Sequence, residues 1–448
     1  MSSHLRSDVP LVVVGNIPEA AYDFLRLAGD ETDHLVHIRQ LKAERSLLWA
    51  CGSKLVVLSY PASHTTYLNE RLGYAGTECI APRNPTAWLS RDILRERQLM
   101  DRVVDYAGRE RTIQLIPYAT TRPFLELAAT LQHEYGLTVL LPESPSPEAL
   151  WLRDFIDTKS GFRSLVGCWL PDGSLPEGFI CQDTHVAANA IGWFLANGQT
   201  CVAKPDRGQA GLGLRLFTDK SVSREAVFED LQQEPFLSTG NVVVEPLIGS
   251  TEGMSPSLEF YVPPCEVGPP ELTYLANQVI AGAGDFHGAV ASRELESTPW
   301  YPTFRESSVL IAERLQAMGY VGHFDIDAIV DDGGRIYLLE VNSRRTGGTH
   351  VHEFGLFALG PNYLDEVVLL SHDALSSGGI TSTDVLLEVM DDLLYPISGD
   401  KRGMVITITS TLPAGKFGCI FVAPTMNEAL TLQESVIQRV RRVTEGTN

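Results

Sequence analysis

A segment of alternating polar and apolar residues around Asp331-Asp-Gly-Gly334 constrains the fold of this chain more than any other feature. The tetrapeptide separates two strand-like runs, and its glycines predict a β-hairpin turn. Side chains in a strand alternate between two faces, so a turn centred on either Asp332 and Gly333 or Gly333 and Gly334 gives the same division. One face then carries four polar residues: Asp325, Asp327, Glu340 and Asn342.

The opposite face of this hairpin is apolar and suits the protein interior. It carries Phe324, Ile326, Ala328, Val330, Tyr337, Leu339 and Val341. Carboxylates that face one another across a strand pair repel unless a cation lies between them. Mg²⁺ is the simplest candidate, because it prefers oxygen ligands and keeps positions for water and substrate phosphates. The alternative is a solvated strand face whose acidic residues serve solubility.

The first third of the chain predicts a parallel sheet. Short apolar runs at 11–14, 54–58 and 137–141 alternate with helix-like stretches, which is typical of strands buried on both faces. The turn after the first run, Gly15-Asn-Ile-Pro18, lacks the glycines that a dinucleotide site requires. We therefore expect a Rossmann-like domain without a Rossmann ligand, which ends at the Pro- and Ser-rich segment 142–147.

Beyond this segment the pattern changes to α+β. We expect a helix from Pro147 to Val166 that is capped by Ser146. Further elements are expected as strands at 200–203, 241–245, 324–330 and 336–341, and as helices near 223–232 and 303–318. After a second linker at Ser376-Ser-Gly-Gly379 come a helix that starts near Asp384, strands at 404–410 and 418–423, and a helix from about Pro424. The expected units are 1–146, 147–370 with subdomains of about 147–240 and 241–370, and 371–448.

Composition excludes several classes of function. The 448 residues include 35 Lys and Arg against 56 Asp and Glu, and a surface with the resulting net charge of −21 would repel nucleic acid. No apolar run approaches the ~20 residues of a membrane span, and residues 1–6 do not resemble a signal peptide, so we expect a soluble cytoplasmic protein. Seven scattered cysteines form no Cys-x-x-Cys pair. The acidic balance favours a cationic or amine-bearing substrate, such as a peptide.

The hairpin and four upstream segments together resemble the ATP-grasp superfamily of ligases. In that superfamily a strand Asp, a Gly turn and a Glu-x-Asn-x-Arg strand end bind the Mg²⁺ ions that bridge the ATP phosphates, and this chain has Glu340-Val-Asn-Ser-Arg344. Upstream, Cys201-Val-Ala-Lys-Pro205 and Gly208-Gln-Ala-Gly-Leu-Gly213 are similar to its strand lysine and its phosphate-covering loop. Val242-Val-Val-Glu-Pro-Leu-Ile-Gly249 resembles the hinge between the two ATP-clasping subdomains, and Asp157-Thr-Lys159 resembles an earlier nucleotide-binding lysine.

The resemblance implies a role for each matched residue. Asp327, Glu340 and Asn342 would hold Mg²⁺. Arg344 would act as the catalytic residue toward the γ-phosphate or the developing oxyanion. The nucleotide would be bound by Lys159 and Lys204 at the phosphates, by Gly208, Gly211 and Gly213 in the covering loop, by Glu245 and Leu247 at the adenine edge, and by Glu252 at the ribose, with Glu259 as a competing candidate. Asp325 is an additional acid relative to many members, which leaves open whether it is also a ligand.

The resemblance also implies the architecture and the reaction. Residues 1–146 would form a Rossmann-like pre-ATP-grasp domain, 147–370 the two-subdomain ATP-grasp fold, and 371–448 a small α+β C-terminal segment. This layout resembles the pheganomycin-type peptide ligases of secondary-metabolite biosynthesis. The implied enzyme uses ATP and Mg²⁺, releases ADP, and joins an amino-acid-like carboxylate to the amino group of a peptide or amino acid through an acyl phosphate.

Two other functions are compatible with the same residues. A small-molecule phosphotransferase would use the same metal-binding face, and a non-catalytic protein would retain ATP binding alone. The sequence also leaves open the identity of the acid and the amine, the oligomeric state, and whether Arg293 or Arg305 binds the substrate carboxylate.

Overall fold

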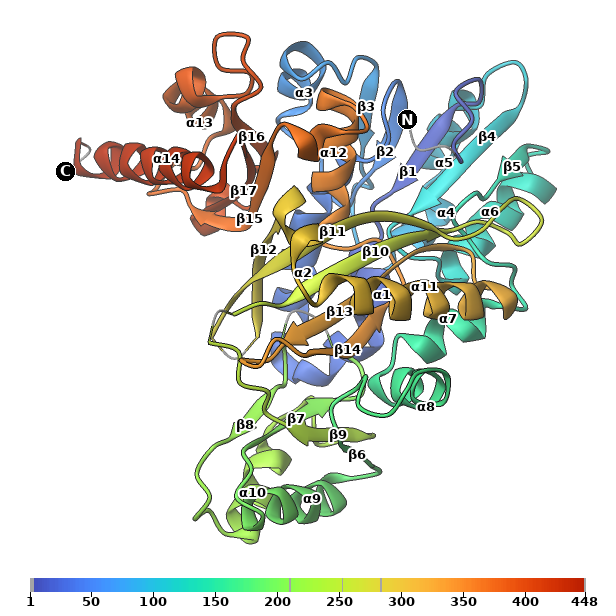
Figure 1. The fold of residues 1–448 in the computed structure, drawn as a ribbon. Coiled ribbons are helices and arrows are strands. Elements are labelled where there is room, and N and C mark those ends of the chain that lie inside the picture. The colour runs from blue at the N-terminus through green and yellow to red at the C-terminus, as the bar shows by residue number, and fades with distance from the viewer. Residues whose placement is uncertain (1–3, 209–210, 252, 283, 447–448) are drawn as a thin grey trace.

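The strands of residues 4–208, 211–251, 253–282 and 284–446, the parts of the chain that the computed structural model describes, form three β-sheets (Figure 1). Sheet A comes from the first third of the chain, sheet B from the middle, and sheet C from the remainder. This combination of a parallel sheet with two antiparallel ones confirms the expected α/β and α+β fold class. Among the described helices, none is both long and apolar enough to cross a membrane.

Sheet A is parallel, in the strand order β3-β2-β1-β4-β5 that a Rossmann-like domain requires. Its strands are β1 (Leu11–Val14), β2 (Lys54–Val57), β3 (Thr77–Ile80), β4 (Thr112–Pro117) and β5 (Thr138–Leu140). The accompanying helices are α1 (Ile17–Leu25), α2 (Thr32–Lys42), α3 (Thr65–Arg71), α4 (Leu89–Arg95), α5 (Arg97–Tyr106) and α6 (Arg122–His133). The sequence did not predict β3 and β4, because polar residues interrupt their apolar runs. In β4 the buried Gln114 is satisfied by donating to the backbone oxygens of Arg6 and Val9.

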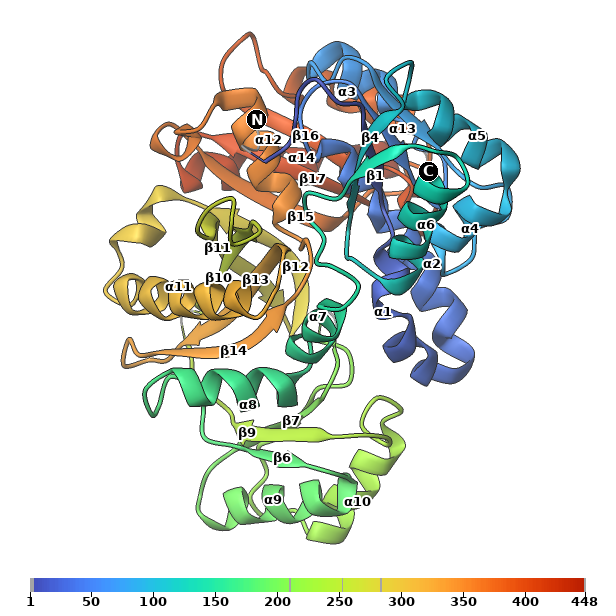
Figure 2. The same cartoon turned by 90° about the vertical axis from the view of Figure 1, so that its right-hand side faces the viewer.

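Sheet B is antiparallel, in the order β6-β9-β7-β8, and forms a separate lobe with two helices at the bottom of Figures 1 and 2. The lobe consists of β6 (Phe179–Cys181), α9 (Thr184–Ala196), β7 (Cys201–Pro205), β8 (Arg215–Phe217), α10 (Arg224–Gln233) and β9 (Val242–Pro246). β9 pairs with both β6 and β7. The expected subdomain division near residue 240 therefore falls one strand too early, because the Gly240 turn precedes a strand of the same sheet.

Sheet C is antiparallel, in the order β14-β13-β10-β11-β12-β15-β17-β16. Its strands are β10 (Pro256–Val262), β11 (Glu271–Ala281), β12 (Asp285–Ala291), β13 (Gly322–Val330), β14 (Ile336–Asn342), β15 (Val368–Ser376), β16 (Gly403–Ile408) and β17 (Lys416–Ala423). β15 spans the boundary expected at 370–371 and pairs with both β12 and β17. The C-terminal segment thus extends the same sheet, and the expected linker begins at the last residue of β15, Ser376, and continues as a turn at Gly378 and Gly379.

The remaining helices connect and cover these sheets. The α-helices are α7 (Leu150–Ile156), α8 (Lys159–Trp169), α11 (Tyr301–Ala317), α12 (Thr349–Leu359), α13 (Thr383–Met390) and α14 (Met426–Gly446). The 3₁₀ helices are η1 (Arg26–Glu31), η2 (Ala43–Leu48), η3 (Arg293–Ser297), η4 (Tyr363–Asp365), η5 (Asp391–Leu393) and η6 (Leu412–Ala414).

The single helix expected over residues 147–166 is two helices, α7 and α8. Between them Thr158 has an extended backbone, and its hydroxyl oxygen accepts a hydrogen bond from the Gly161 N–H at 2.9 Å. A threonine that caps a new helix in this way competes with continuation of the preceding one. The break makes Lys159 the first residue of α8.

The two faces of sheet A have different partners. Val12 and Val14 pack with residues of α4 to α6. Val13 points the other way, as strand alternation requires, into a core that also contains Met404 and Phe421. The N-terminal domain and the C-terminal segment therefore share one hydrophobic core, and Figure 2 shows them side by side.

One buried arginine joins segments from three parts of the chain. Arg345 is 1% exposed, and its Nε and Nη2 donate to the two carboxylate oxygens of Glu143 at 2.9 and 2.6 Å. Its Nη1 donates to Glu353 of α12, and its guanidinium lies over the Trp49 ring, 4.8 Å from the centroid. Burial opposes these charges, but the ion pairs outweigh burial: they raise the pKa of Arg345 and hold the pKa of Glu143 well below its usual range.

Replacing this arginine tests its contribution to stability. Arg345→Leu leaves two buried carboxylates without their counter-charge, so we expect the free energy of unfolding to fall by about 3 to 5 kcal/mol. Arg97→Leu, whose side chain is 90% exposed, should change it by less than about 0.5 kcal/mol. Urea unfolding followed by tryptophan fluorescence measures both, and equal unfolding midpoints for the two variants would contradict the assignment.

A second buried acid, Glu44, predicts how the stability of the protein decreases at low pH. Glu44 of η2 accepts hydrogen bonds from the Ser410 N–H at 2.7 Å and from the His64 ring at 2.9 Å. Burial alone would raise its pKa, but His64 and the backbone donor lower it to about 2. The contribution of Glu44 is therefore complete above its unfolded-state pKa of about 4.5 and is lost as the pH falls toward 2.

We expect the melting temperature of the Glu44→Gln variant to depend less on pH between about 4.5 and 2 than that of the unsubstituted protein. The exposed Glu110→Gln variant should follow the unsubstituted protein throughout. Thermal unfolding followed by circular dichroism across this pH range provides the measurement, and parallel curves for all three proteins would rule out the linkage.

Candidate functional site

β13 and β14 form the predicted hairpin and bring the polar residues together at its open end. Asp325 pairs with Asn342, and Asp327 pairs with Glu340. This register is the one that a turn centred on Gly333–Gly334 predicts. Two carboxylates and one amide from β13 and β14 thus lie beside Asp325 on one side of the sheet.

A β-bulge changes the alternation nearer the turn. The prediction that Tyr337 and Leu339 belong to the apolar face is wrong: Ile336 and Leu338 are buried there instead, at 8% and 2% exposure. Ala328 pairs with Leu338, which leaves Leu339 as the extra residue of β14. One inserted residue reverses which side chains face the core. Because the bulge lies on the turn side of Glu340, the polar end of the hairpin keeps its predicted face.

Hydrogen bonds from neighbouring strands hold the two aspartates. The Asn342 Nδ2 donates to Asp327 Oδ2 at 2.9 Å, and the Gln278 side chain of β11 donates to Asp327 Oδ1. Ser257 of β10 donates to Asp325 Oδ2 at 3.1 Å. The other oxygen of Asp325, Oδ1, is buried and has no hydrogen-bond partner among the described residues. An unused buried carboxylate oxygen is a ligand position that the protein itself does not fill.

The electrostatics of this acidic face favour binding of a cation. Burial, followed by the neighbouring carboxylate of Glu340, raises the pKa of Asp327 to about 7. Burial and Asp327 raise the pKa of Asp325 well above its usual range. Burial also opposes ionisation of Glu340, but Lys159 outweighs it and lowers that pKa. A bound divalent cation would allow all three acids to ionise, so these oxygen donors fit Mg²⁺.

Two lysines predicted to meet phosphates are paired with acids. The Lys159 Nζ lies 2.6 Å from Glu340 Oε2, which links α8 to the acidic face. The Lys204 Nζ lies 2.5 Å from Glu245 Oε2, and the Arg163 Nη1 lies 2.5 Å from Glu245 Oε1. Glu245 is therefore engaged by two cations at 2% exposure. Its contact with an adenine edge stays a prediction, and its observed role is to hold Lys204.

The glycine loop between β7 and β8 approaches the turn between β11 and β12. Gly211 and Gly213 have positive φ angles of 77° and 80°, a conformation that favours glycine. A Cβ at Gly211 would lie 2.5 Å from the Gly284 carbonyl oxygen, and a Cβ at Gly208 would lie 3.0 Å from the Lys159 Nζ. Glycine at these positions thus permits close approach of the loop to both neighbours.

The two remaining predicted nucleotide contacts are Leu247 at the hinge and Glu252. Leu247 is 37% exposed, and its N–H donates to the Thr200 carbonyl oxygen at 2.9 Å. That N–H is thus engaged within the protein, and adenine binding near Leu247 stays a prediction that needs other backbone groups. Glu252, the predicted ribose contact, lies outside the described residues.

Arg344 reaches from the end of β14 toward the same acidic face. Its Nη2 donates to Asn342 Oδ1 at 2.7 Å, and its guanidinium lies 5.5 Å from the centroid of the Tyr118 ring. Burial opposes its charge, but Tyr118 and Asp157 outweigh burial and raise the pKa of Arg344. Because the Asn342 amide oxygen accepts from Arg344, metal binding by Asn342 stays a prediction.

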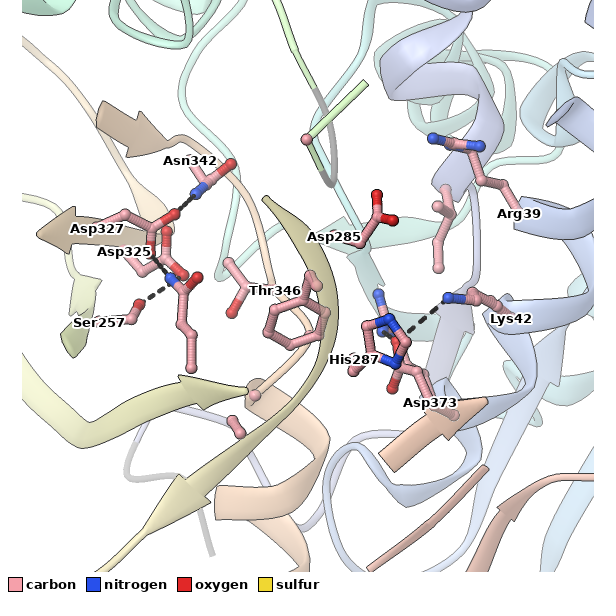
Figure 3. Close-up of a pocket in the computed structure, with 18 of the residues that line it drawn as sticks. Arg39, Lys42, Ser257, Asp285, His287, Asp325, Asp327, Asn342, Thr346 and Asp373 are labelled. Carbon is pink, nitrogen blue, oxygen red and sulfur yellow. Dashed lines mark hydrogen bonds and ion pairs between the residues drawn. The ribbon is translucent and has the colours of Figure 1, made fainter. Parts of the chain in front are cut away.

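A cavity of about 400 Å³ unites these groups (Figure 3). Its acidic wall is formed by Asp325, Asp327, Glu340 and Asn342, with Arg344 beside them. Of the described glycine-loop residues, Gly211 and Leu212 line it. Among the described residues, Lys159, Lys204, Glu245 and Leu247 do not line it, although Lys159 reaches its edge through Glu340.

The cavity also contains residues that sequence reasoning missed. Figure 3 shows Arg39, Lys42 and Asp373 on the side opposite Asp325 and Asp327. A signal was present for the basic residues, because Arg39, Lys42 and Arg45 recur every third residue and so share one helix face. No local pattern marks Asp373, which lies within the largely apolar β15.

The comparisons with known proteins find similarity to solved structures alone. No family model and no curated protein matches the chain. Biotin carboxylase from Campylobacter jejuni, solved as a β-γ-ATP complex, is similar with a TM-score of 0.58 and 13% identity, over 98% of this chain and 95% of that one. N5-carboxyaminoimidazole synthetase from Staphylococcus aureus is similar with a TM-score of 0.53 and 10% identity, over 97% and 99%.

A third structure adds to this set. The biotin carboxylase domain of the Hydrogenobacter thermophilus 2-oxoglutarate carboxylase has a TM-score of 0.53 and 15% identity, over 97% of this chain and 90% of that one. These neighbours are members of the ATP-grasp superfamily. The described architecture is therefore the ATP-grasp fold that the sequence motifs resemble.

The raised pKa of Asp327 predicts how Mg²⁺ binding depends on pH. A proton on this carboxylate competes with the cation, so with a pKa of about 7 we expect affinity to be about tenfold lower near pH 6 than near pH 8. Asp327→Asn should bind Mg²⁺ more weakly and should lose the part of this dependence that Asp327 contributes. Isothermal titration calorimetry at the two pH values measures the effect, and equal affinity in the unsubstituted protein would refute it.

Proposed function

We propose that this protein is an ATP-dependent, ADP-forming ligase that joins a carboxylate to an amine through an acyl phosphate. The observation that carries the proposal is the convergence on one cavity of the acidic face of β13 and β14, the Arg344 guanidinium and the glycine loop. Joining a carboxylate to an amine in water is unfavourable, so the acid has to be activated first. A site that gathers phosphate-binding and carboxylate-binding groups around one small cavity suits that activation.

Different residues of the chain would perform different parts of this reaction. Mg²⁺ held by Asp327, Glu340 and Asn342 would neutralise the phosphoryl group during transfer. Lys159 and Lys204 would exchange their carboxylate partners for phosphates of ATP. Arg344 offers a planar pair of donors to the transferred phosphoryl group or to the carboxylate that attacks it.

The glycine loop would protect the activated acid. Its contact with the turn between β11 and β12, through Gly211 and Gly284, covers the cavity from the sheet B lobe. Closure of such a loop excludes water, which would otherwise hydrolyse an acyl phosphate.

The structural neighbours support the use of a nucleotide with Mg²⁺. One was solved with β-γ-ATP, one with MgADP and bicarbonate, and an Aspergillus clavatus N5-carboxyaminoimidazole synthase with ADP and 5-aminoimidazole ribonucleotide. The last has a TM-score of 0.51 and 13% identity, over 97% of this chain and 99% of that one. A small molecule as substrate is consistent with these complexes.

The finer proposal is peptide-bond formation. The sequence layout resembles the pheganomycin-type peptide ligases, so we propose an amino-acid-like carboxylate as the activated acid and the amino group of an amino acid or peptide as the acceptor. A cytoplasmic role in secondary metabolism accompanies this proposal.

Product analysis distinguishes the proposed reaction from its alternatives. ADP release is screened with Mg²⁺ and ATP over pools of amino acids, modified acids and short peptides, and products are identified by mass spectrometry. ADP that appears only when acid and amine are both present supports ligation. A stable phosphorylated acceptor would indicate a phosphotransferase, and AMP with pyrophosphate would eliminate the acyl-phosphate scheme.

Glu340→Gln provides the site-specific test. The substitution keeps the size of the side chain but removes the charge at the centre of the acidic face, so we expect ADP release to fall about 100-fold or more. Glu126→Gln, on an exposed position of α6, should retain the rate of the unsubstituted protein. Circular dichroism confirms that both variants fold, and undiminished turnover in Glu340→Gln would remove this residue from the metal site.

A further inference from the structure

The wall of the cavity opposite the acidic face is rich in basic residues (Figure 3). We call it the basic wall, and its cations are Arg39 and Lys42 of α2, Arg45 of η2, and Lys416 at the start of β17. The other titratable residues that face it are Asp285 and His287 of β12 and Asp373 of β15. Four cations thus face two carboxylates, in a chain whose net charge is −21.

Only one of the two carboxylate oxygens of Asp373, Oδ2, is paired with cations of this wall. The Arg45 Nη1 lies 2.8 Å from Asp373 Oδ2, and the Lys42 Nζ lies 3.7 Å from the same oxygen. Asp373 Oδ1 and Arg45 Nε have no hydrogen-bond partner among the described residues, although their side chains are only 3% and 8% exposed. Buried polar atoms without partners are uncommon, and Arg45 Nε, a hydrogen-bond donor beside the cavity, indicates an acceptor group on a ligand. Asp373 Oδ1 is an acceptor and does not itself favour an anion.

Positive charge in the wall exceeds what Asp373 compensates. Burial is the main cause that lowers the pKa of Lys42, and Arg45, Arg39 and Lys416 add to it against the opposing effect of Asp373. Burial is also the main cause that lowers the pKa of Arg39 to about 10. An anion placed among these side chains would relieve their mutual repulsion and their desolvation.

We propose that the basic wall binds an anionic group, a carboxylate or a phosphate, on the substrate whose reacting group lies at the acidic face. This inference rests on the proposed function, which assigns the reacting end to Asp327, Glu340 and Arg344. One cavity of about 400 Å³ contains both walls, so its size allows a single small molecule to contact both. The substrate is therefore bifunctional, with its reacting group at one end and a second, anionic group at the other.

Anion titrations of the intact protein test this proposal. Isothermal titration calorimetry with succinate and with inorganic phosphate is carried out on protein saturated with MgADP, so that the region of Lys159 and Lys204 is occupied. We expect at least one of the two anions to bind. Lys42→Gln should weaken binding about tenfold, because it removes one charged hydrogen bond.

Two further variants complete the design. Lys416→Gln changes an exposed strand end that tolerates substitution, and it should weaken binding about three- to fivefold. Lys220→Gln, on the surface of the sheet B lobe, is the matched control and should bind as the unsubstituted protein does. Tighter binding of succinate identifies the anionic group as a carboxylate, and tighter binding of phosphate identifies it as a phosphate.

Binding of neither anion, or unchanged binding in both Lys42→Gln and Lys416→Gln, would overturn the proposal. Failure of the proposed function has different signatures, namely an unsubstituted protein that does not bind MgADP, or one that binds MgADP but forms no ligated product from acid and amine. In the first case the same anion titrations on a nucleotide-free variant that carries both Lys159→Gln and Lys204→Gln still test the basic wall, because that variant lacks both competing phosphate lysines.

Discussion

The ion pairs of Arg345 with Glu143 and Glu353 are the interaction on which the rest of the structure depends. They hold the end of β14 against the N-terminal domain, and the Arg345 N–H adds a hydrogen bond to the Tyr118 carbonyl oxygen at 3.0 Å. Arg344 precedes Arg345, so this anchoring directs its guanidinium over the Tyr118 ring and toward the cavity. A buried ion pair contributes less to stability than its Coulomb energy suggests, and its stronger effect here is to determine geometry.

The charges that line the cavity differ from the net charge of the whole protein. The net charge of −21 favours a cationic substrate, yet Arg39, Lys42 and Lys416 face the acidic strands across one cavity. Surface charge acts over about a Debye length, roughly 8 Å in physiological salt, whereas a ligand in the cavity meets only the nearest side chains. The two walls therefore select a molecule with chemically different ends, which the overall composition does not reveal.

The sequence was sufficient where local periodicity decides the outcome. Asp327 and Glu340 belong to one hairpin, so a glycine turn and a period of two place them on one face. It was insufficient for the bulge at Leu339, because the choice depends on how Ile336 and Leu338 pack in a core with residues of α8, which is distant in the chain. The basic wall was missed although Arg39, Lys42 and Arg45 recur every third residue, because only the fold brings them to Lys416 and to the cavity.

The core shared by sheet A and the C-terminal segment has a consequence for synthesis. Val13 is translated about 390 residues before Met404, its partner in that core, which at roughly 5 to 20 residues per second is a delay of tens of seconds. Throughout that interval this core contains only its N-terminal part, which includes residues of η2 and α3, and lacks the apolar side chains that the C-terminal segment supplies. A chain interrupted before β17 would lack Phe421 of that core and the Lys416 side of the cavity, so apolar surface that the full chain buries would stay exposed.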